Sequence, residues 1–410
     1  MRATKKYLSK LQEPLIEERP SSLLSIVVTI PAYNEAETIK SIDALLDCDH
    51  PKGAVEVLVN INYSETVSGC SKKFNKASFQ VLENYAKIKS TDNFRIYILF
   101  FPNQDSKIAG VGWARKQLMD EAFRRLLGAQ NEDGIITGFD ADSSCQKNYL
   151  VALEDFFESK PRATGCSIKF EHNISGDKFS LEIYQAIILY ELHLRYFINA
   201  QKLIGTPSAF QTVGSSFAVK AKHYAAVNGM SPKKAGEDFY FLQKVIALGH
   251  FYQLNTTCVY PSSRISNRVG FGTGPSVGEI SQNGKKLTYN YKSFKEIKKL
   301  FDLLPSIYEK DFHPEDSGLA ELFIDYLIKQ KIEQVVRNLK KNNKSFERFK
   351  AAFMQWFGGF QILKVLNILR QTEFFQDLDV VSQVNELGLI NKSDSALQLL
   401  NQIRVFDASV

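Results

Sequence analysis

The sequence predicts an α/β fold, with a doubly wound, mixed but mostly parallel sheet, helices on both faces, and a helical C-terminal appendage. Short β-branched or aromatic runs alternate with amphipathic stretches between Leu23 and Tyr260, and this alternation is typical of parallel sheets covered by helices. After Gly284 the strand-like runs almost disappear, while Phe and Leu recur at helical spacing. A length of 410 residues also exceeds the usual size of one domain.

The first predicted strand is Ser25–Ile30, which ends at Pro31 because proline cannot donate to a sheet ladder. Asn34 and Glu37 have the spacing of an N-cap and its capping-box partner, which predicts a helix directly after them. The further strands are expected at 55–59, 94–101, 134–139, 163–170, 211–219 and 251–260. The further helices are expected at 78–88, 113–127, 148–157, 184–197 and 238–248.

The composition divides the chain into four segments. We expect a polar N-terminal arm over 1–22, an α/β domain over 23–262, a flexible glycine-rich loop over 263–284 and a helical region over 285–410. The lysines of the helical region have two interpretations. They contact an anionic membrane or acceptor, or they form a solvated surface. Interspersed acidic residues favour the solvated surface.

Charge and cysteine usage exclude some classes of protein. The net charge of +6 is modest and is expected to be spread along the chain, which argues against a dedicated nucleic-acid binder. Five cysteines without a C-x-x-C pair fit a reducing cytoplasm. No secretory signal is recognisable at the N-terminus. The apolar stretch 183–203 contains Glu191, His193 and Arg195, so it is expected to be a core helix instead of a transmembrane segment. A cytoplasmic protein is predicted, with peripheral contact at the inner membrane face left open.

The tripeptide Asp140-Ala141-Asp142 follows directly on the apolar run Gly134–Phe139. Open α/β sheets bind ligands at the carboxyl ends of their strands, so two carboxylates at this place are a candidate binding site. Hard oxygen ligands suit Mn²⁺ or Mg²⁺ bridging to a diphosphate. A simple turn is the alternative, because acidic residues are common turn formers.

The segment Pro31-Ala32-Tyr33-Asn34-Glu35 lies at the end of the first predicted strand. A strand stop, an N-cap and an acidic first turn account for Pro31, Asn34 and Glu35 without any ligand. Tyr33 is left over. Its ring can stack on a nucleotide base at the sheet edge, or pack on the following helix.

Two cations, Arg115 and Lys116, follow Gly110 and Gly112 in the first turn of a predicted helix. Cations there oppose the helix macrodipole by about 0.3 to 1 kcal/mol per charge, so an anion is expected beside them. The glycines, the helix N-terminus and the cations together suit a diphosphate cradle. A solvated helix end is the alternative.

Two more charged segments follow. Glu237 and Asp238 precede a predicted helix, where they are either capping residues or include a general base for an acceptor hydroxyl. Arg264 and Arg268 lead into the glycine-rich loop. They are either solvated charges or part of a lid over a bound phosphate.

In this order, the five segments resemble the inverting nucleotide-sugar glycosyltransferases of the GT-A fold, in the large family 2 grouping. The resemblance spans about 23–260. It implies that the acidic tripeptide is the D-x-D motif, with Asp140 and Asp142 at a Mn²⁺ or Mg²⁺ ion and Asp142 as the direct ligand. It also implies that Asp238 is the catalytic base, next to Glu237 in an E-D motif.

The resemblance further implies a nucleotide-sugar donor and a carbohydrate or lipid-linked acceptor, with no nucleic-acid partner. The donor site would comprise residues from all these segments and from the sugar-lining segment near 211–218: Pro31, Ala32, Tyr33, Asn34, Glu35, Asn60, Asn62, Gly110, Arg115, Asp140, Ala141, Gly214, Ser215, Arg264 and Arg268.

The chain departs from the family pattern after its second strand. Where the family often has paired aspartates, this chain has Asn60 and Asn62. An amide both donates and accepts hydrogen bonds, so a contact with the base survives while its preference changes. The Q-x-x-R-W motif of processive synthases is absent, which favours transfer of a single sugar.

Three other functions remain as alternatives. A nucleotidyltransferase usually has glycine and lysine in the loop after its first strand, whereas 31–35 contains neither. A hydrolase with paired carboxylates leaves the cationic helix start unexplained. A catalytically degenerate, nucleotide-binding scaffold subunit would explain the loss of the paired aspartates.

Overall fold

The computed structural model describes residues 2–233, 236–266, 268 and 272–409. The chain forms two compact units, Met1–Gly176 with Thr212–Pro275, and Asp177–Gln211 with Ser276–Val410. The first unit contains the sheet, and the second is almost entirely helical. The aromatic helix near 184–197 therefore groups with the C-terminal helices, whereas the sequence places it within the α/β domain.

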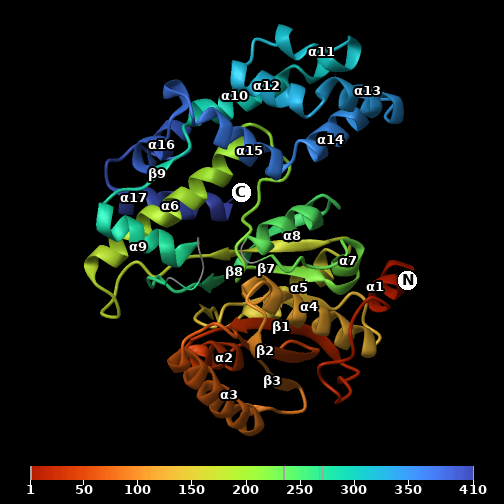
Figure 1. Cartoon of the computed structure of the whole chain (residues 1–410), viewed down its shortest axis with the longest axis vertical. Coiled ribbons are helices and arrows are strands. Elements are labelled where there is room, and N and C mark those ends of the chain that lie inside the picture. The colour runs from red at the N-terminus through yellow and green to blue at the C-terminus, as the bar shows by residue number, and fades with distance from the viewer. Residues whose placement is uncertain (1, 234–235, 267, 269–271, 410) are drawn as a thin grey trace. The chain divides into compact units, whose positions relative to one another are not determined.

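The first unit is built on a mixed sheet of strand order β3-β2-β1-β4-β7-β6-β8-β5 (Figure 1). Its long ladders β1–β2, β2–β3 and β6–β8 are parallel, as is β1–β4, whereas β7 and β5 run antiparallel to their neighbours. The predicted fold class is confirmed. The strands are β1 (Leu24–Ala32), β2 (Ala54–Ser64), β3 (Phe94–Gln104), β4 (Ile135–Gly138), β5 (Ser144–Cys145), β6 (Gly165–Phe170), β7 (Phe217–Lys220) and β8 (Phe251–Tyr260).

Helices cover both faces of this sheet. The helices of the first unit are α1 (Arg2–Leu8), α2 (Thr38–Leu46), α3 (Gly69–Lys89), α4 (Val111–Gly128), α5 (Tyr149–Ser159), α7 (Ala221–Ala226) and α8 (Glu237–Ile246). Helix α3 packs on β2 and β3, while α4 packs on β1, β2 and β4 from the other side (Figure 1). The register aligns the strand ends, because Ala32 of β1 lies opposite Ile61 of β2. Loops after these strands therefore meet at one edge.

Several predicted boundaries are wrong. Strand β1 continues through Pro31 to Ala32, since Pro31 still lies in register with Asn60 of β2. The expected strand 211–219 is reduced to β7, and helix α9 (Thr273–Asn283) occupies part of the expected glycine-rich loop. Other parts of that loop, residues 267 and 269–271, lie outside the described residues.

The polar N-terminal arm contains helix α1, which sequence reasoning missed. Tyr7 is buried, and its ring makes edge contacts with Phe123 and Tyr224 at centroid distances of 5.5 and 5.6 Å. Its hydroxyl donates to Oδ1 of Asp120 at 2.7 Å. One aromatic anchor with a satisfied hydroxyl thus fixes a helix that is otherwise too short and polar to be predicted.

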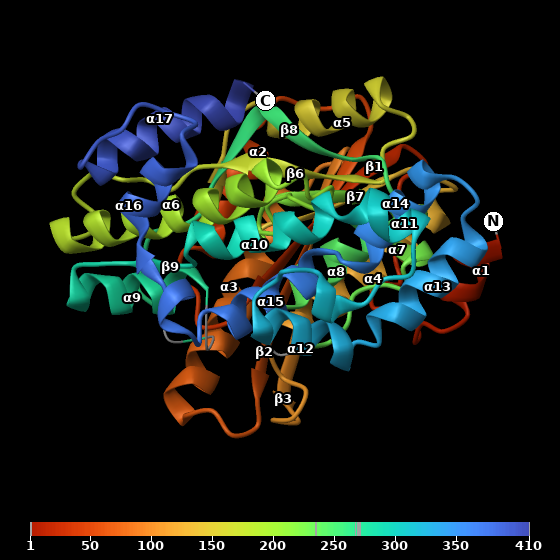
Figure 2. The ribbon, with the colours of Figure 1, turned by 90° about the horizontal axis from the view of Figure 1, so that it is seen from above.

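The second unit packs helices around α6 (Leu181–Leu203). Figures 1 and 2 both show α16 and α17 along α6, and all three are in contact. Arg195 of α6 donates to Asp407 of α17 at 2.7 Å inside this packing. No helix in the described part of the chain is long and apolar enough to cross a membrane. The remaining helices are α10 (Tyr291–Asp302), α11 (Leu304–Glu309), α12 (Glu321–Lys329), α13 (Ile332–Asn342), α14 (Phe346–Trp356), α15 (Gly359–Leu369), α16 (Val380–Leu387) and α17 (Ala396–Ser409), with a short hairpin of β9 (Leu287–Thr288) and β10 (Leu378–Asp379).

Candidate active site

A cavity of about 450 Å³ opens at the carboxyl ends of β1, β2 and β4 in the first unit. Its wall comes from those strand ends, from the start of α4 and from the segment after β8. Eleven of the residues expected from the sequence line it: Pro31, Ala32, Tyr33, Glu35, Asn62, Gly110, Asp140, Ala141, Asp142, Arg264 and Arg268.

Other lining residues were missed by sequence reasoning. They lie at the end of β2, in the first turns of α4 and α9 and in the loops beside these elements, and their residue types alone carry no functional pattern. They are Tyr63, Ser64, Val67, Ala109, Val111, Pro261, Ser262, Ser266, Gly272, Thr273 and Gly274.

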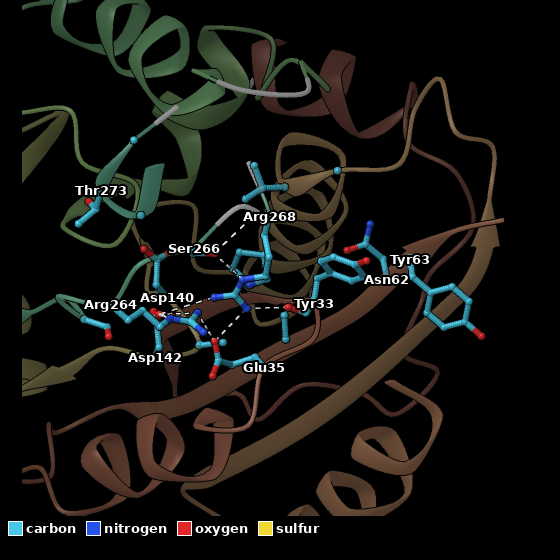
Figure 3. A pocket seen from close by; sticks show the side chains of 18 of the residues that line it. Tyr33, Glu35, Asn62, Tyr63, Asp140, Asp142, Arg264, Ser266, Arg268 and Thr273 are labelled. Atoms are coloured by element: carbon cyan, nitrogen blue, oxygen red, sulfur yellow. Dashed lines mark hydrogen bonds and ion pairs between the residues drawn. The ribbon is translucent and has the colours of Figure 1, made fainter. Parts of the chain in front are cut away.

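Two arginines of the segment after β8 hold two carboxylates of the cavity wall (Figure 3). Arg264 donates from Nε to Oδ2 of Asp142 at 2.7 Å and from Nη2 to Oε2 of Glu35. Arg268 donates from Nη1 to the same Glu35 oxygen at 2.9 Å and to the carbonyl oxygen of Tyr33 at 2.7 Å. Glu35 therefore anchors both guanidinium groups at the cavity.

Because Glu35 and Asp142 are largely removed from solvent, the ionisation of their carboxyl groups depends on the arginines. Glu35 is 5% exposed, and burial raises its pKa, while the Arg264 guanidinium opposes the rise. Burial likewise raises the pKa of Asp142, and Arg264 again opposes it. Two buried carboxylates close together need a nearby cation to stay ionised, and the arginines supply that charge.

Asp140 and Asp142 both line the cavity directly after β4, where a divalent ion could be held. Among the described residues, no cluster of three or more His, Cys, Asp or Glu side chains is arranged to hold a metal ion alone. Magnesium and manganese sites at nucleotides need only one or two carboxylates, because phosphates and water complete the shell. The donor set of Asp140 and Asp142 therefore fits such an ion.

Arg115 lies behind the cavity wall, with only 6% of its side chain exposed. It donates from Nη2 to Oδ1 of Asp140 at 2.5 Å and from Nη1 to Oε1 of Glu237 at 3.1 Å, and Oδ2 of Asp238 is 3.8 Å from Nη1. A Cβ atom at Gly214 would stand 1.8 Å from Nη1, so only glycine leaves room for this guanidinium. The two acidic motifs are thus joined through one buried cation.

The anion expected beside the cationic start of α4 is provided by the protein itself. Arg115 is paired as described, and Lys116 lies 2.6 Å from Oδ2 of Asp120 one turn along α4. The start of the helix nevertheless reaches the ligand space, because Gly110 and Val111 line the cavity. The positive end of the helix dipole is a suitable place for a phosphate.

Asp238 stands next to this buried pair at the start of α8. Burial and repulsion from Glu237 raise the pKa of Asp238 to about 6, and Arg115 opposes the rise. About a quarter of the Asp238 side chain remains exposed. A carboxylate with this pKa, accessible and held on a helix, has the properties of a general base near neutral pH.

The uncharged end of the cavity contains Tyr33, Asn62 and Tyr63 (Figure 3). Asn62 is 5% exposed and lines the cavity. Asn60, two residues earlier on β2, is fully buried, and neither of its side-chain polar atoms has a hydrogen-bond partner among the described residues. The two asparagines expected at the base are therefore separated, with only Asn62 at the cavity.

Asn34 shapes the loop without lining the cavity. It has a positive φ of 47°, donates from Nδ2 to Ser71 at 2.9 Å, and accepts from Asn75 at 2.6 Å. The predicted N-cap at Asn34 is wrong, because α2 begins at Thr38. The backbone N–H of Glu37 is instead bonded to the Glu35 carboxylate at 2.9 Å. The other expected residues away from the lining are Asn60, Arg115, Gly214, Ser215, Glu237 and Asp238.

Comparison with known proteins gives no sequence match, since neither a family model nor a curated protein matches this chain. Among solved structures, the chain is similar to S. aureus TarS 1–349 with a TM-score of 0.39 and 15% identity, covering 72% of this chain and 68% of that chain. The complex of TarS 1–349 with UDP-GlcNAc gives a TM-score of 0.40 and 15% identity, with coverages of 72% and 69%. The mannosyltransferase PcManGT from Pyrobaculum calidifontis, in complex with GDP-Man and Mn²⁺, gives 0.38 and 12%, with coverages of 99% and 95%.

Proposed function

We propose that the chain is an inverting, metal-dependent glycosyltransferase of the GT-A fold, similar to family 2, which moves a hexose from a nucleoside-diphosphate sugar to an acceptor hydroxyl. The observation that carries this proposal is the link made by Arg115. It joins Asp140, which lines the cavity, to Glu237 and Asp238 outside the lining. A leaving-group site and a candidate base are thereby held at a fixed separation, as group transfer requires.

The donor is proposed to lie along the cavity with its base near Tyr33 and Asn62. Its diphosphate would face Arg264, Arg268 and the start of α4. Guanidinium groups bind phosphate oxygens through paired hydrogen bonds, and a helix N-terminus adds its dipole. Entry of the diphosphate would replace the contact of Arg264 with Asp142, while Glu35 keeps both arginines anchored.

Asp140 and Asp142 would hold Mn²⁺ or Mg²⁺ beside the diphosphate. The bound ion supplies positive charge that stabilises the departing diphosphate. Arg115 fixes the orientation of Asp140 through the 2.5 Å contact. Glu237 compensates the second nitrogen of the same guanidinium, so this buried cation remains balanced.

Transfer would be a single displacement at the anomeric carbon. The acceptor oxygen attacks the face opposite the diphosphate, the new C–O bond forms as the C–O bond to the diphosphate breaks, and the hydroxyl proton passes to Asp238. A base with a pKa of about 6 is mostly ionised at neutral pH and accepts this proton when the oxygen becomes acidic during attack. The product would have the inverted configuration.

The test is a calorimetric panel of UDP-, GDP-, dTDP- and CMP-sugars with and without Mn²⁺, followed by transfer assays with the donor that binds. We expect one nucleotide class to bind more tightly with Mn²⁺, and NMR of the product to report inversion. Binding of no nucleoside diphosphate would favour the scaffold subunit. Pyrophosphate release from a nucleoside triphosphate and a sugar phosphate would favour the nucleotidyltransferase.

A further inference from the structure

The net charge of the chain is concentrated in one short stretch, contrary to the even spread expected from its composition. Residues 329–350 contain eight of the 51 lysines and arginines but only two of the 45 acidic residues. The rest of the chain has 43 of each. The entire formal net charge of +6 therefore lies in these 22 residues.

This stretch forms the end of α12, helix α13, the turn after it and the first half of α14 in the second unit. Helices α13 and α14 pack against each other as neighbours in the chain (Figure 1). Their apolar residues face inward, with Ile332, Val336, Phe349 and Phe353 buried. Seven cations on the outside are exposed and are called the basic face here: Lys329, Lys331, Arg337, Lys341, Lys344, Arg348 and Lys350.

The basic face has almost no internal compensation. Within the described residues, only Arg337 of the seven has a carboxylate within 4 Å, and Glu333 is 3.9 Å away. Some exposed lysines elsewhere on the surface are paired, as Lys52 is with Glu158 at 2.7 Å. Like charges that repel each other without partners cost stability, so the basic face is best explained by an external anion.

We propose that the basic face binds an anionic lipid bilayer at the level of the headgroups. Each exposed lysine or arginine near a bilayer surface adds to the attraction to anionic lipids. The apolar residues of α13 are directed into the unit, so the contact is electrostatic adsorption without insertion of the helix. Ile328, directly before the first of these cations and 45% exposed, is available for a shallow apolar contact.

The composition of the basic face favours lipid over nucleic acid. Single-stranded nucleic acid is bound by cations interleaved with exposed aromatic rings on which bases stack. In 329–350 the only aromatic residues are Phe346, which is half-buried, and Phe349, which is buried. A face of cations without stacking platforms matches a surface of many mobile phosphates better than a strand of bases.

The test is co-sedimentation of the full chain with phosphatidylglycerol/phosphatidylcholine vesicles and with pure phosphatidylcholine vesicles, without nucleotide, at about 0.15 M salt. We expect binding only to the anionic vesicles. Combined Arg337→Glu, Lys341→Glu and Lys344→Glu should lower the partition coefficient on the order of 100-fold, because each cation near the surface contributes several-fold.

A matched control reverses three exposed lysines elsewhere: Lys73→Glu, Lys76→Glu and Lys392→Glu. Its net charge equals that of the test variant, and it should bind vesicles like the unchanged protein. Thermal unfolding of both variants checks that they fold. Equal loss in both variants would show a general charge effect and overturn the proposal, as would equal binding to neutral vesicles. Binding of an RNA homopolymer that depends on the basic face, without vesicle binding, would overturn it too. None of these readouts depends on sugar transfer.

Discussion

At one end of the cavity Glu35 and Asp142 share two guanidinium groups, whereas at the other end Asn62 presents an uncharged amide beside Tyr33. The charged end is crossed by these ion pairs, and it connects through Arg115 to Asp238. At the amide end the lining side chains of Tyr33, Asn62 and Tyr63 are uncharged. On the proposed function, we expect the rate of chemistry to be set at the charged end and the choice of nucleotide at the amide end.

The strongest test of this division replaces the proposed base. Asp238→Asn keeps the shape of the side chain but cannot accept the acceptor proton, so kcat should fall by about 10²- to 10⁴-fold. Donor affinity, measured by calorimetry, should change little because Asp238 does not line the cavity. A variant with unchanged kcat would contradict the role of Asp238, and a large loss of donor affinity would contradict the separation of roles.

The next largest effect is expected at the buried guanidinium. Gly214→Ala places a Cβ where the Arg115 guanidinium now lies, since that atom would stand 1.8 Å from Nη1. Displacing this buried cation should destabilise the protein by about 1 to 3 kcal/mol. It should also lower kcat, because Asp140 loses its fixed partner. Chemical denaturation and steady-state kinetics measure the two effects.

A glycine with open surroundings provides the control for this variant. At Gly69, where α3 begins, a Cβ would have no atom within 4 Å. Gly69→Ala should therefore leave both stability and kcat nearly unchanged, or raise stability slightly through helix propensity. If both glycine variants behaved alike, the close approach of Arg115 to Gly214 would have no energetic importance.

Sequence patterns predicted the sheet edge well because parallel strands place their carboxyl ends together. That rule alone brought Glu35, Asn62, Asp140 and Asp142 to one cavity wall. The helix-dipole argument assigned Arg115 to the diphosphate, whereas the guanidinium is buried against Asp140 and Glu237. Long-range pairing of charges has no local pattern, so the partner of a cation cannot be predicted from its neighbours in the chain.

The N-terminal loop illustrates the same limit. Asn34 has the spacing of an N-cap, but its amide is bonded to Ser71 and Asn75, some forty residues away on α3. Tertiary contacts outweigh a capping preference of about 1 kcal/mol. Likewise, helix α1 depends on burial of Tyr7 against residues over a hundred positions distant. Such elements follow from packing and not from local composition.

The pH dependence of transfer offers a finer test of the charged end. With the pKa of Asp238 raised to about 6, kcat/KM should fall by about tenfold per pH unit below 6 and level off above it. Glu237→Gln removes a repelling charge, so the acidic limb should move to lower pH. An unshifted limb would mean that another group controls it.

The same raised pKa has a consequence for stability. The folded protein holds the Asp238 proton more tightly than the unfolded chain, whose pKa is near 3.8. This contribution to stability is complete below the unfolded value and is lost as the pH rises through about 6. As the pH rises from 4 to 7, thermal unfolding should therefore show a smaller loss of stability for Asp238→Asn than for the unchanged protein.

The smallest effects are expected at the amide end, where the two asparagines can be separated. Asn62→Ala removes one uncharged hydrogen bond to the donor base, so nucleotide affinity should fall only about two- to tenfold, corresponding to about 0.5 to 1.5 kcal/mol. Asn60→Val should leave affinity unchanged and raise stability by about 1 kcal/mol, because the buried Asn60 amide has no partner among the described residues. Calorimetry and denaturation measure both variants. A loss of affinity in Asn60→Val matching that in Asn62→Ala would show that both amides read the base, and the amide end would then extend deeper into β2 than the cavity wall indicates.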